Sequence, residues 1–177
     1  MKKKTLALVL ALTLLVAGIV GGTLAWLTDQ TAEVKNTFTV GDISIGLTET
    51  TADYKMVPGN TITKDPTVTV KANSEACWLF VKVTESADLK DFITYAIAEG
   101  WTALPGVDGV YYREVPASAA DQTFSVLAGD AVTVKSDVTR TMLETAKADA
   151  PALTFKAYAI QRDHFATADA AWAEVNP

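Results

Sequence analysis

The sequence predicts an all-β protein, an antiparallel sandwich with one or two short helices that follows a signal-peptide helix. Three observations lead to this fold class. Beyond Trp26, apolar and polar residues alternate with a period of two, which is typical of strands with one buried face. Turn-forming residues separate these runs at short intervals, and no long helices alternate with them. A barrel has the same periodicity, so the pattern alone leaves sandwich and barrel open.

The amino end has the three parts of a secretory signal. Lysines occupy positions 2–4, an apolar stretch covers 5–20, and small residues follow up to Ala25. We expect a signal peptidase to cut between Ala25 and Trp26. The apolar stretch carries no charge, and roughly 20 apolar residues suffice to span a bilayer, so a retained membrane anchor is the alternative.

The remaining chain contains a series of short alternating runs. The run at 77–84 is apolar on both faces at its start, which predicts a central strand covered on both sides. The strands that we expect lie at 37–40, 43–47, 67–71, 77–84, 92–98, 110–115, 122–127, 131–135 and 153–161.

Turns and two helices complete the predicted framework. The segment 138–149 is rich in Met, Leu, Glu and Lys and ends before Pro151, which favours a helix. Thr167 can cap a second helix over 168–175, with Asp169 in its first turn, where the helix dipole favours an anion. Turn signals lie at 58–60, 71–74, 105–106, 108–109 and 129–130.

Composition argues against most enzyme classes and against nucleic acid as a partner. The formal net charge is −6, whereas phosphate binding needs clustered Lys and Arg. One cysteine and one histidine leave no intrachain disulfide, no multi-cysteine metal site and no two-histidine zinc site. We therefore expect no metal and no cofactor, although a weak calcium site built from loops stays open.

The single histidine and the single cysteine both have structural interpretations. Asp163 is the neighbour of His164, and adjacent strand side chains point to opposite faces, so a Ser-His-Asp site is not expected. No Gly-x-Ser-x-Gly elbow is present. Cys77 opens the most apolar run, which predicts a buried thiol that packs as a small hydrophobe. The sequence therefore predicts no catalytic residue.

The segment 26–36 follows the expected cleavage site and has a mixed, extended pattern. Trp26 and Leu27 come first, and polar residues interrupted by Val34 follow. One interpretation is a first strand in the protein's own sheet. The other is a strand donated to the sheet edge of a neighbouring molecule.

The stretch 21–49 resembles the amino-terminal signature of exported bacterial proteins that a SipW-type signal peptidase processes, the TasA/camelysin-like biofilm matrix proteins. The resemblance is dense from residue 1 to about 85, and 57–60 and 64–66 are similar to a second loop of that family. The matching residues of the first stretch are Gly21 to Ala25, Asp29, Asn36, Thr37, Phe38 and Gly41.

The resemblance implies a secreted, jelly-roll-like sandwich whose relatives form extracellular fibres. It implies that Ala25 and Trp26 flank the scissile bond and that 26–38 is the donated strand, with Trp26, Leu27, Val34 and Phe38 as its apolar residues. Its partners would be the SipW-type signal peptidase and other copies of the chain or related matrix subunits. The membrane would be contacted only through the signal peptide, before cleavage.

These observations give one expected organisation and three candidate functions. We expect a signal peptide at 1–25, an extended segment at 26–36 and a sandwich domain at 37–177. The first function is a non-catalytic, secreted structural subunit or accessory component of biofilm-matrix fibres. The alternatives are an exported monomeric adhesin or binding module at the cell surface, and a camelysin-like surface protease.

Overall fold

The computed structural model describes residue 3 and residues 42–50, 55–146 and 151–175. The chain divides into two units, Met1–Thr39 and Val40–Pro177, and the strands described here all belong to the second. The predicted strand at 37–40 and the segment 26–36 lie outside the described residues. The strands are β1 (Ile45–Thr48), β2 (Thr61–Thr63), β3 (Thr67–Val70), β4 (Cys77–Glu85), β5 (Ile93–Thr94), β6 (Thr102–Ala103), β7 (Val110–Val115), β8 (Gln122–Ser125), β9 (Ala131–Val134) and β10 (Leu153–Gln161).

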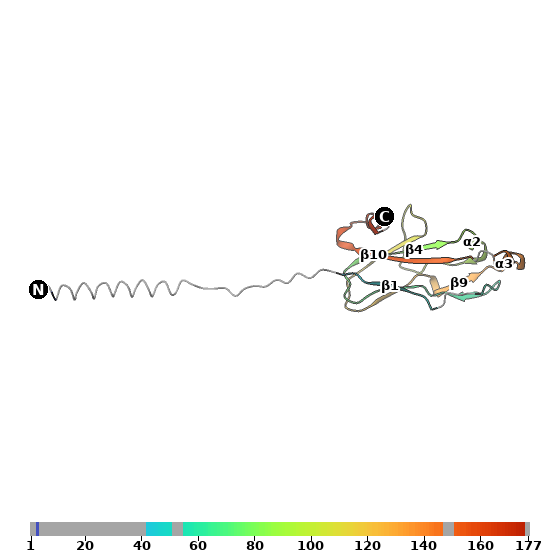
Figure 1. Ribbon diagram of the computed structural model, residues 1–177, viewed down its shortest axis with the longest axis horizontal. Helices are drawn as coiled ribbons and strands as arrows, with labels where there is room; N and C mark the ends of the chain where they lie inside the picture. Colours follow the sequence, from blue (N-terminus) through green and yellow to red (C-terminus); the bar gives the residue numbers. More distant parts are fainter. Residues whose placement is uncertain (1–2, 4–41, 51–54, 147–150, 176–177) are drawn as a thin grey trace. The chain divides into compact units, whose positions relative to one another are not determined.

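The described strands form three antiparallel sheets. The largest has the order β10-β4-β7-β6, the second has the order β1-β3-β8, and the third has the order β2-β9-β5. Figure 1 shows β10 and β4 in one layer and β1 and β9 in the other. The protein is therefore an all-β sandwich, as the alternating pattern predicted.

The main core fills the space between the β4 sheet and the β3 sheet. The side chains of β4 and β3 that point toward the opposite sheet are almost completely buried. A residue and its cross-strand partner point to the same face, so neighbouring strands add to the same layer of the core. The buried residues of this cluster are Val68, Val70, Cys77, Leu79, Val81, Val83, Val115 and Val126. The prediction of a buried Cys77 is confirmed, since its side chain has no exposed surface.

The outer face of β4 is covered by the last helix, α4 (Ala168–Val175). Trp78 and Phe80 point to this face, and the ring of Trp172 lies 5.3 Å from Phe80 and 5.1 Å from Tyr158. Burial on both faces confirms the prediction of a central strand at 77–84. The cap of the helix is also confirmed, because the backbone N–H of Ala170 donates to Thr167 Oγ1 at 3.3 Å.

A third cluster lies where the β9 sheet meets two short helices, α2 (Leu89–Phe92) and α3 (Arg140–Ala146). Buried Leu89, Phe92 and Val138 pack with the β9 residues Val132 and Val134. The helix predicted at 138–149 begins at Arg140, and its last predicted residues, 147–149, lie outside the described part of the chain.

The predicted strand at 92–98 is wrong in most of its length. Leu89 and Phe92 are three residues apart, which places both on one side of a helical turn facing the core. The strand β5 then covers only Ile93–Thr94, and Ile97 makes an isolated bridge to Leu127. The run 92–98 does not predict this change of conformation, because it contains no turn-forming residue.

The predicted turns occur where expected, and one glycine among them is sterically required. Gly109 has a φ of 71°, and a Cβ added there would lie 2.4 Å from the carbonyl oxygen of Val83. That close approach lets the Val83 N–H donate to Gly109 O at 2.7 Å, which closes the start of β7 onto β4.

Candidate functional site

The site that the fold creates is a groove between two edge strands, β1 and β10. Within the described residues, β1 pairs only with β3 and β10 pairs only with β4. The two strands lie next to each other but have no backbone ladder between them. The groove has a volume of about 310 Å³ and is lined by Leu47, Thr48, Glu49, Pro66, Leu153, Thr154 and Phe155.

Leu47 is the residue that best reveals incomplete packing at this edge. It pairs with Val68, as Ile45 pairs with Val70, so Leu47 and Ile45 point to the same inner face. Val68 and Val70 are fully buried, yet Leu47 keeps 37% of its surface exposed. An inward-facing leucine at the edge of a sandwich is thus left without a full cover.

The facing strand β10 has the same character. Phe155, Ala157 and Ala159 point toward the core, but each is only half-buried, whereas their partners on β4 are buried. Leu47 on one wall and the half-buried Leu153 and Phe155 on the other therefore leave apolar surface exposed in the groove.

Polar contacts fix one end of the groove. The ammonium of buried Lys64 lies 2.6 Å from Glu49 Oε1 and 5.4 Å from the ring centre of Phe155. Removing the carboxylate of such a pair destabilises the folded protein, because it leaves the charge of Lys64 buried without this partner. The pair holds the end of β1 against the loop that leads into β3.

Asp65 adds a second contact between the same two segments. Its carboxylate accepts hydrogen bonds from the backbone N–H of Thr50, at 3.0 Å, and from the Thr50 hydroxyl. The Thr50 hydroxyl, followed by the Thr50 N–H, lowers the pKa of the Asp65 carboxyl below its ordinary value. The motif at 64–66 therefore ties down one end of the groove, and Pro66 forms part of its wall.

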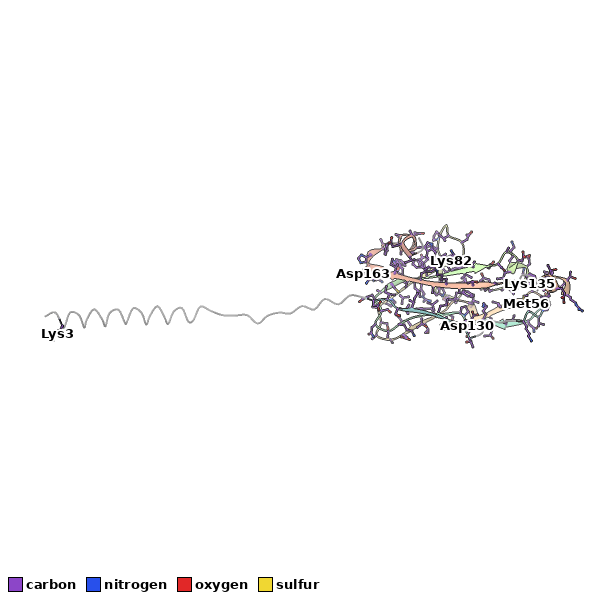
Figure 2. All side chains as sticks on the ribbon, in the orientation of Figure 1. Lys3, Met56, Lys82, Asp130, Lys135 and Asp163 are labelled. Carbon is purple, nitrogen blue, oxygen red and sulfur yellow. The ribbon has the colours of Figure 1, made fainter. Side chains whose placement is uncertain are left out.

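The histidine and the cleavage and donor residues predicted from the sequence are either exposed on a turn or outside the described residues. His164 and Asp163 are exposed on the turn η2 (Arg162–His164), and Figure 2 places Asp163 at the opposite end of the strands from Lys135. Neither lines the groove. The predicted cleavage residues Ala25 and Trp26, and the predicted donor residues Trp26, Leu27, Val34 and Phe38, lie outside the described residues.

The sequence does not predict the groove, because no local pattern indicates that β1 and β10 are neighbours. The available signal was weak. The run at 153–161 alternates, and its inward positions include two small residues, Ala157 and Ala159. The exposed Leu47 carries no signal at all, since the alternation of 43–47 predicts it to be buried.

One comparison with known proteins gives a match. Residues 1–82 match the family described as camelysin metallo-endopeptidase, so the amino-terminal part of the chain is similar to TasA/camelysin-like proteins. The match ends within β4 and includes β1 but not β10. No curated protein and no solved structure matches the chain.

The family's description implies a metal ion, and the residues that the structure describes do not fit one. They contain no group of three or more His, Cys, Asp or Glu side chains placed to hold a metal. The one histidine of the sequence is exposed on η2, and Cys77 is buried in the core. In the same described ranges, no helix is long and apolar enough to cross a membrane.

Proposed function

We propose that the chain is a secreted, non-catalytic structural protein, a subunit or accessory component of extracellular biofilm-matrix fibres. Its subunits join when the amino-terminal strand of one molecule enters the groove between β1 and β10 of the next. A SipW-type signal peptidase releases that strand by cutting between Ala25 and Trp26. The observation that carries this proposal is the inward-facing, partly uncovered Leu47 at a sheet edge.

The sequence of the proposed donor suits such a groove. In an extended strand, residues separated by an even number of positions point to the same side, so Trp26, Val34 and Phe38 share one face. That face would cover Leu47 and the half-buried residues of β10. The backbone of the strand would pair with the free edge of β1 or β10, which is the usual source of affinity in β-strand addition.

Proteolysis would act as the switch for assembly. While the signal peptide is in the bilayer, the segment that follows it is held at the membrane. After cleavage this segment is free to reach another molecule. A contact made by the donor of one copy and the groove of the next does not close on itself, so it extends into a filament.

A monomeric, exported adhesin or binding module is the second candidate. Only Gly41 and Asp42 separate the predicted strand 37–40 from the alternating run at 43–47. A two-residue connection of this type favours a hairpin, which would place 37–40 on the free edge of the molecule's own β1. In that case the groove is covered within one chain and no polymer forms.

Light scattering and electron microscopy on residues 26–177, prepared with Trp26 as the native amino terminus, test the proposal. We expect filaments that are absent when 26–35 is deleted. Filaments that persist after the deletion would exclude strand donation, and a stable monomer at high concentration would favour the binding module. Casein cleavage measured on the same preparation, with and without a chelator, tests the protease alternative, and we expect no activity that co-purifies with the chain.

A further inference from the structure

A second groove lies on another part of the sandwich, and it shares no lining residue with the first. It forms where the end of β4, the helix α2, the strand β5 and the strand β7 converge. Its volume is about 420 Å³. It is lined by Glu85, Lys90, Ile93, Thr94, Tyr95, Ile97 and Tyr111. Lys135, at the end of the strands opposite Asp163, fixes α2 here by donating to the carbonyl oxygen of Lys90 at 2.6 Å (Figure 2).

Two polar side chains of this groove, Tyr95 and Glu85, are joined by a hydrogen bond. The hydroxyl of Tyr95 donates to Glu85 Oε1 at 2.5 Å. Burial, and next the contact with Glu85, raises the pKa of Tyr95, so its hydroxyl stays a hydrogen-bond donor at neutral pH. Oε2 of Glu85 accepts no hydrogen bond from the described residues, and the Glu85 side chain is exposed. It is therefore available to accept from a ligand.

The aromatic part of the groove is anchored to the core. Tyr95 and Tyr111 are half-buried, and both pack against the main core between the sheets. A tyrosine presents an apolar ring together with a polar hydroxyl, and side chains that are already ordered lose little conformational entropy when a ligand binds. Exposed Thr94 and the exposed ammonium of Lys90 add a hydroxyl and a donor at the rim.

This combination selects among ligand classes. One carboxylate and one ammonium give the lining no net charge, which does not favour polyanions, and the chain as a whole carries −6. The strand β5 is only two residues long, so it offers too short an edge for an added peptide strand. The lining places apolar rings beside a carboxylate, an ammonium and hydroxyls. A neutral sugar ring matches this lining, because it has an apolar face and many hydroxyls. The volume is within the range of small-ligand sites.

We propose that the groove of Glu85, Lys90, Tyr95 and Tyr111 binds the sugar units of a neutral polysaccharide. The ring of Tyr111 contacts the apolar face of a sugar, and Glu85 accepts hydrogen bonds from its hydroxyls. This inference does not depend on fibre formation, since the lining comes entirely from residues 85–111 of one molecule.

Affinity electrophoresis of the full chain in a sugar-free detergent tests the proposal. Native gels would contain dextran, levan or galactomannan, which present glucose, fructose, and mannose with galactose. We expect retardation by at least one of them, with the association constant lowered about tenfold or more by Glu85→Gln and by Tyr111→Ala. Glu114→Gln, which removes an exposed carboxylate from the same strand as Tyr111, is the matched control and leaves retardation unchanged.

The outcomes are distinguishable even if Tyr111→Ala disturbs the core. Glu85 and Lys90 are exposed, so Glu85→Gln and Lys90→Ala keep the fold, and circular dichroism checks this. Migration unaffected by all three polysaccharides overturns the proposal. Retardation that both of these variants leave intact also overturns it. Alginate, a polyanion, is the further probe: binding to alginate alone that is abolished by salt would be electrostatic and would overturn the proposal too.

Discussion

Arg113 is a charged side chain packed between two aromatic rings. It points from β7 into the sandwich, where its guanidinium carbon lies 3.9 Å from the ring centre of Phe124 and 5.3 Å from that of Trp101. Its Nε is buried and has no hydrogen-bond partner there. Burial lowers the pKa of Arg113, which is the direction expected for a partly desolvated cation. The aromatic rings stabilise the charged guanidinium, whereas the loss of water around it destabilises the same charge.

Replacing Arg113 with methionine and with alanine separates packing from charge. Methionine keeps most of the apolar stem and removes the desolvated charge, so we expect the free energy of unfolding to stay within about 1 kcal/mol of wild type. Alanine also removes the stem between the two rings, and we expect a loss of about 2 kcal/mol. Urea denaturation measures both. An equal loss in the two variants would mean that the charge itself stabilises the fold.

Cys77 predicts a pH dependence of stability. Burial raises the pKa of its thiol to about 11 from an ordinary value of 9.0. Below pH 9 the thiol is protonated in both the folded and the unfolded chain. Between about 9 and 11 the unfolded chain loses this proton and the folded chain does not, so the free energy of unfolding falls as the pH rises.

We expect this fall to reach about 2 kcal/mol in wild type and to be absent from Cys77→Ala. The measurement is the difference between the urea denaturation curves of the two proteins at pH 8 and at pH 11. Taking the difference removes the effect of Tyr95, whose pKa is also raised. If the two proteins change equally with pH, the thiol is accessible to water in the folded state.

At the scale of elements, α4 is the part whose contribution is easiest to isolate. It closes the outer face of β4 through Trp172, which is almost completely buried between Phe80 and Tyr158. Trp172→Ala removes that ring, and we expect it to lower the free energy of unfolding by about 3 kcal/mol. Glu174→Ala, on the exposed side of the same helix, is the control and should change it by less than about 0.5 kcal/mol. Urea denaturation of both variants checks this, and similar values would show that α4 is dispensable for stability.

The elements that the sequence predicts well are those with a local signal. The cap at Thr167 and the acidic Asp169 in the first turn identify α4. Alternation identifies β3 and β10, and a run that is apolar on both faces identifies β4. By contrast, β2 and β6 are short, largely exposed strands whose existence depends on the neighbours with which they pair. The same reason hides both grooves. The walls of the first groove come from β1 and β10, which are far apart in the sequence, and the walls of the second come from four elements between residues 85 and 111. In both cases only the tertiary structure brings the lining residues together.

At the scale of the whole molecule, the proposed fibre needs two complementary parts, a donor and a groove. Each can be disabled separately. Val34→Asp together with Phe38→Asp places charges on the donor face, and Leu47→Asp places one in the groove. A charge that must be buried without a partner is strongly unfavourable, so either change should prevent a strand from seating. Val57→Asp is the control, because Val57 is another apolar residue, 48% exposed, that does not line the groove.

Mixing the two defective proteins gives the most specific prediction. Alone, each should remain monomeric by light scattering, since one lacks a working donor and the other a working groove. Together, the intact donor of the Leu47→Asp protein can enter the intact groove of the donor variant, and the resulting pair has no further functional donor or groove. We therefore expect a heterodimer that does not grow, while Val57→Asp alone forms filaments like wild type. Filaments from Leu47→Asp alone would rule out this groove as the acceptor, and a mixture that stays monomeric would indicate that each chain covers its own groove.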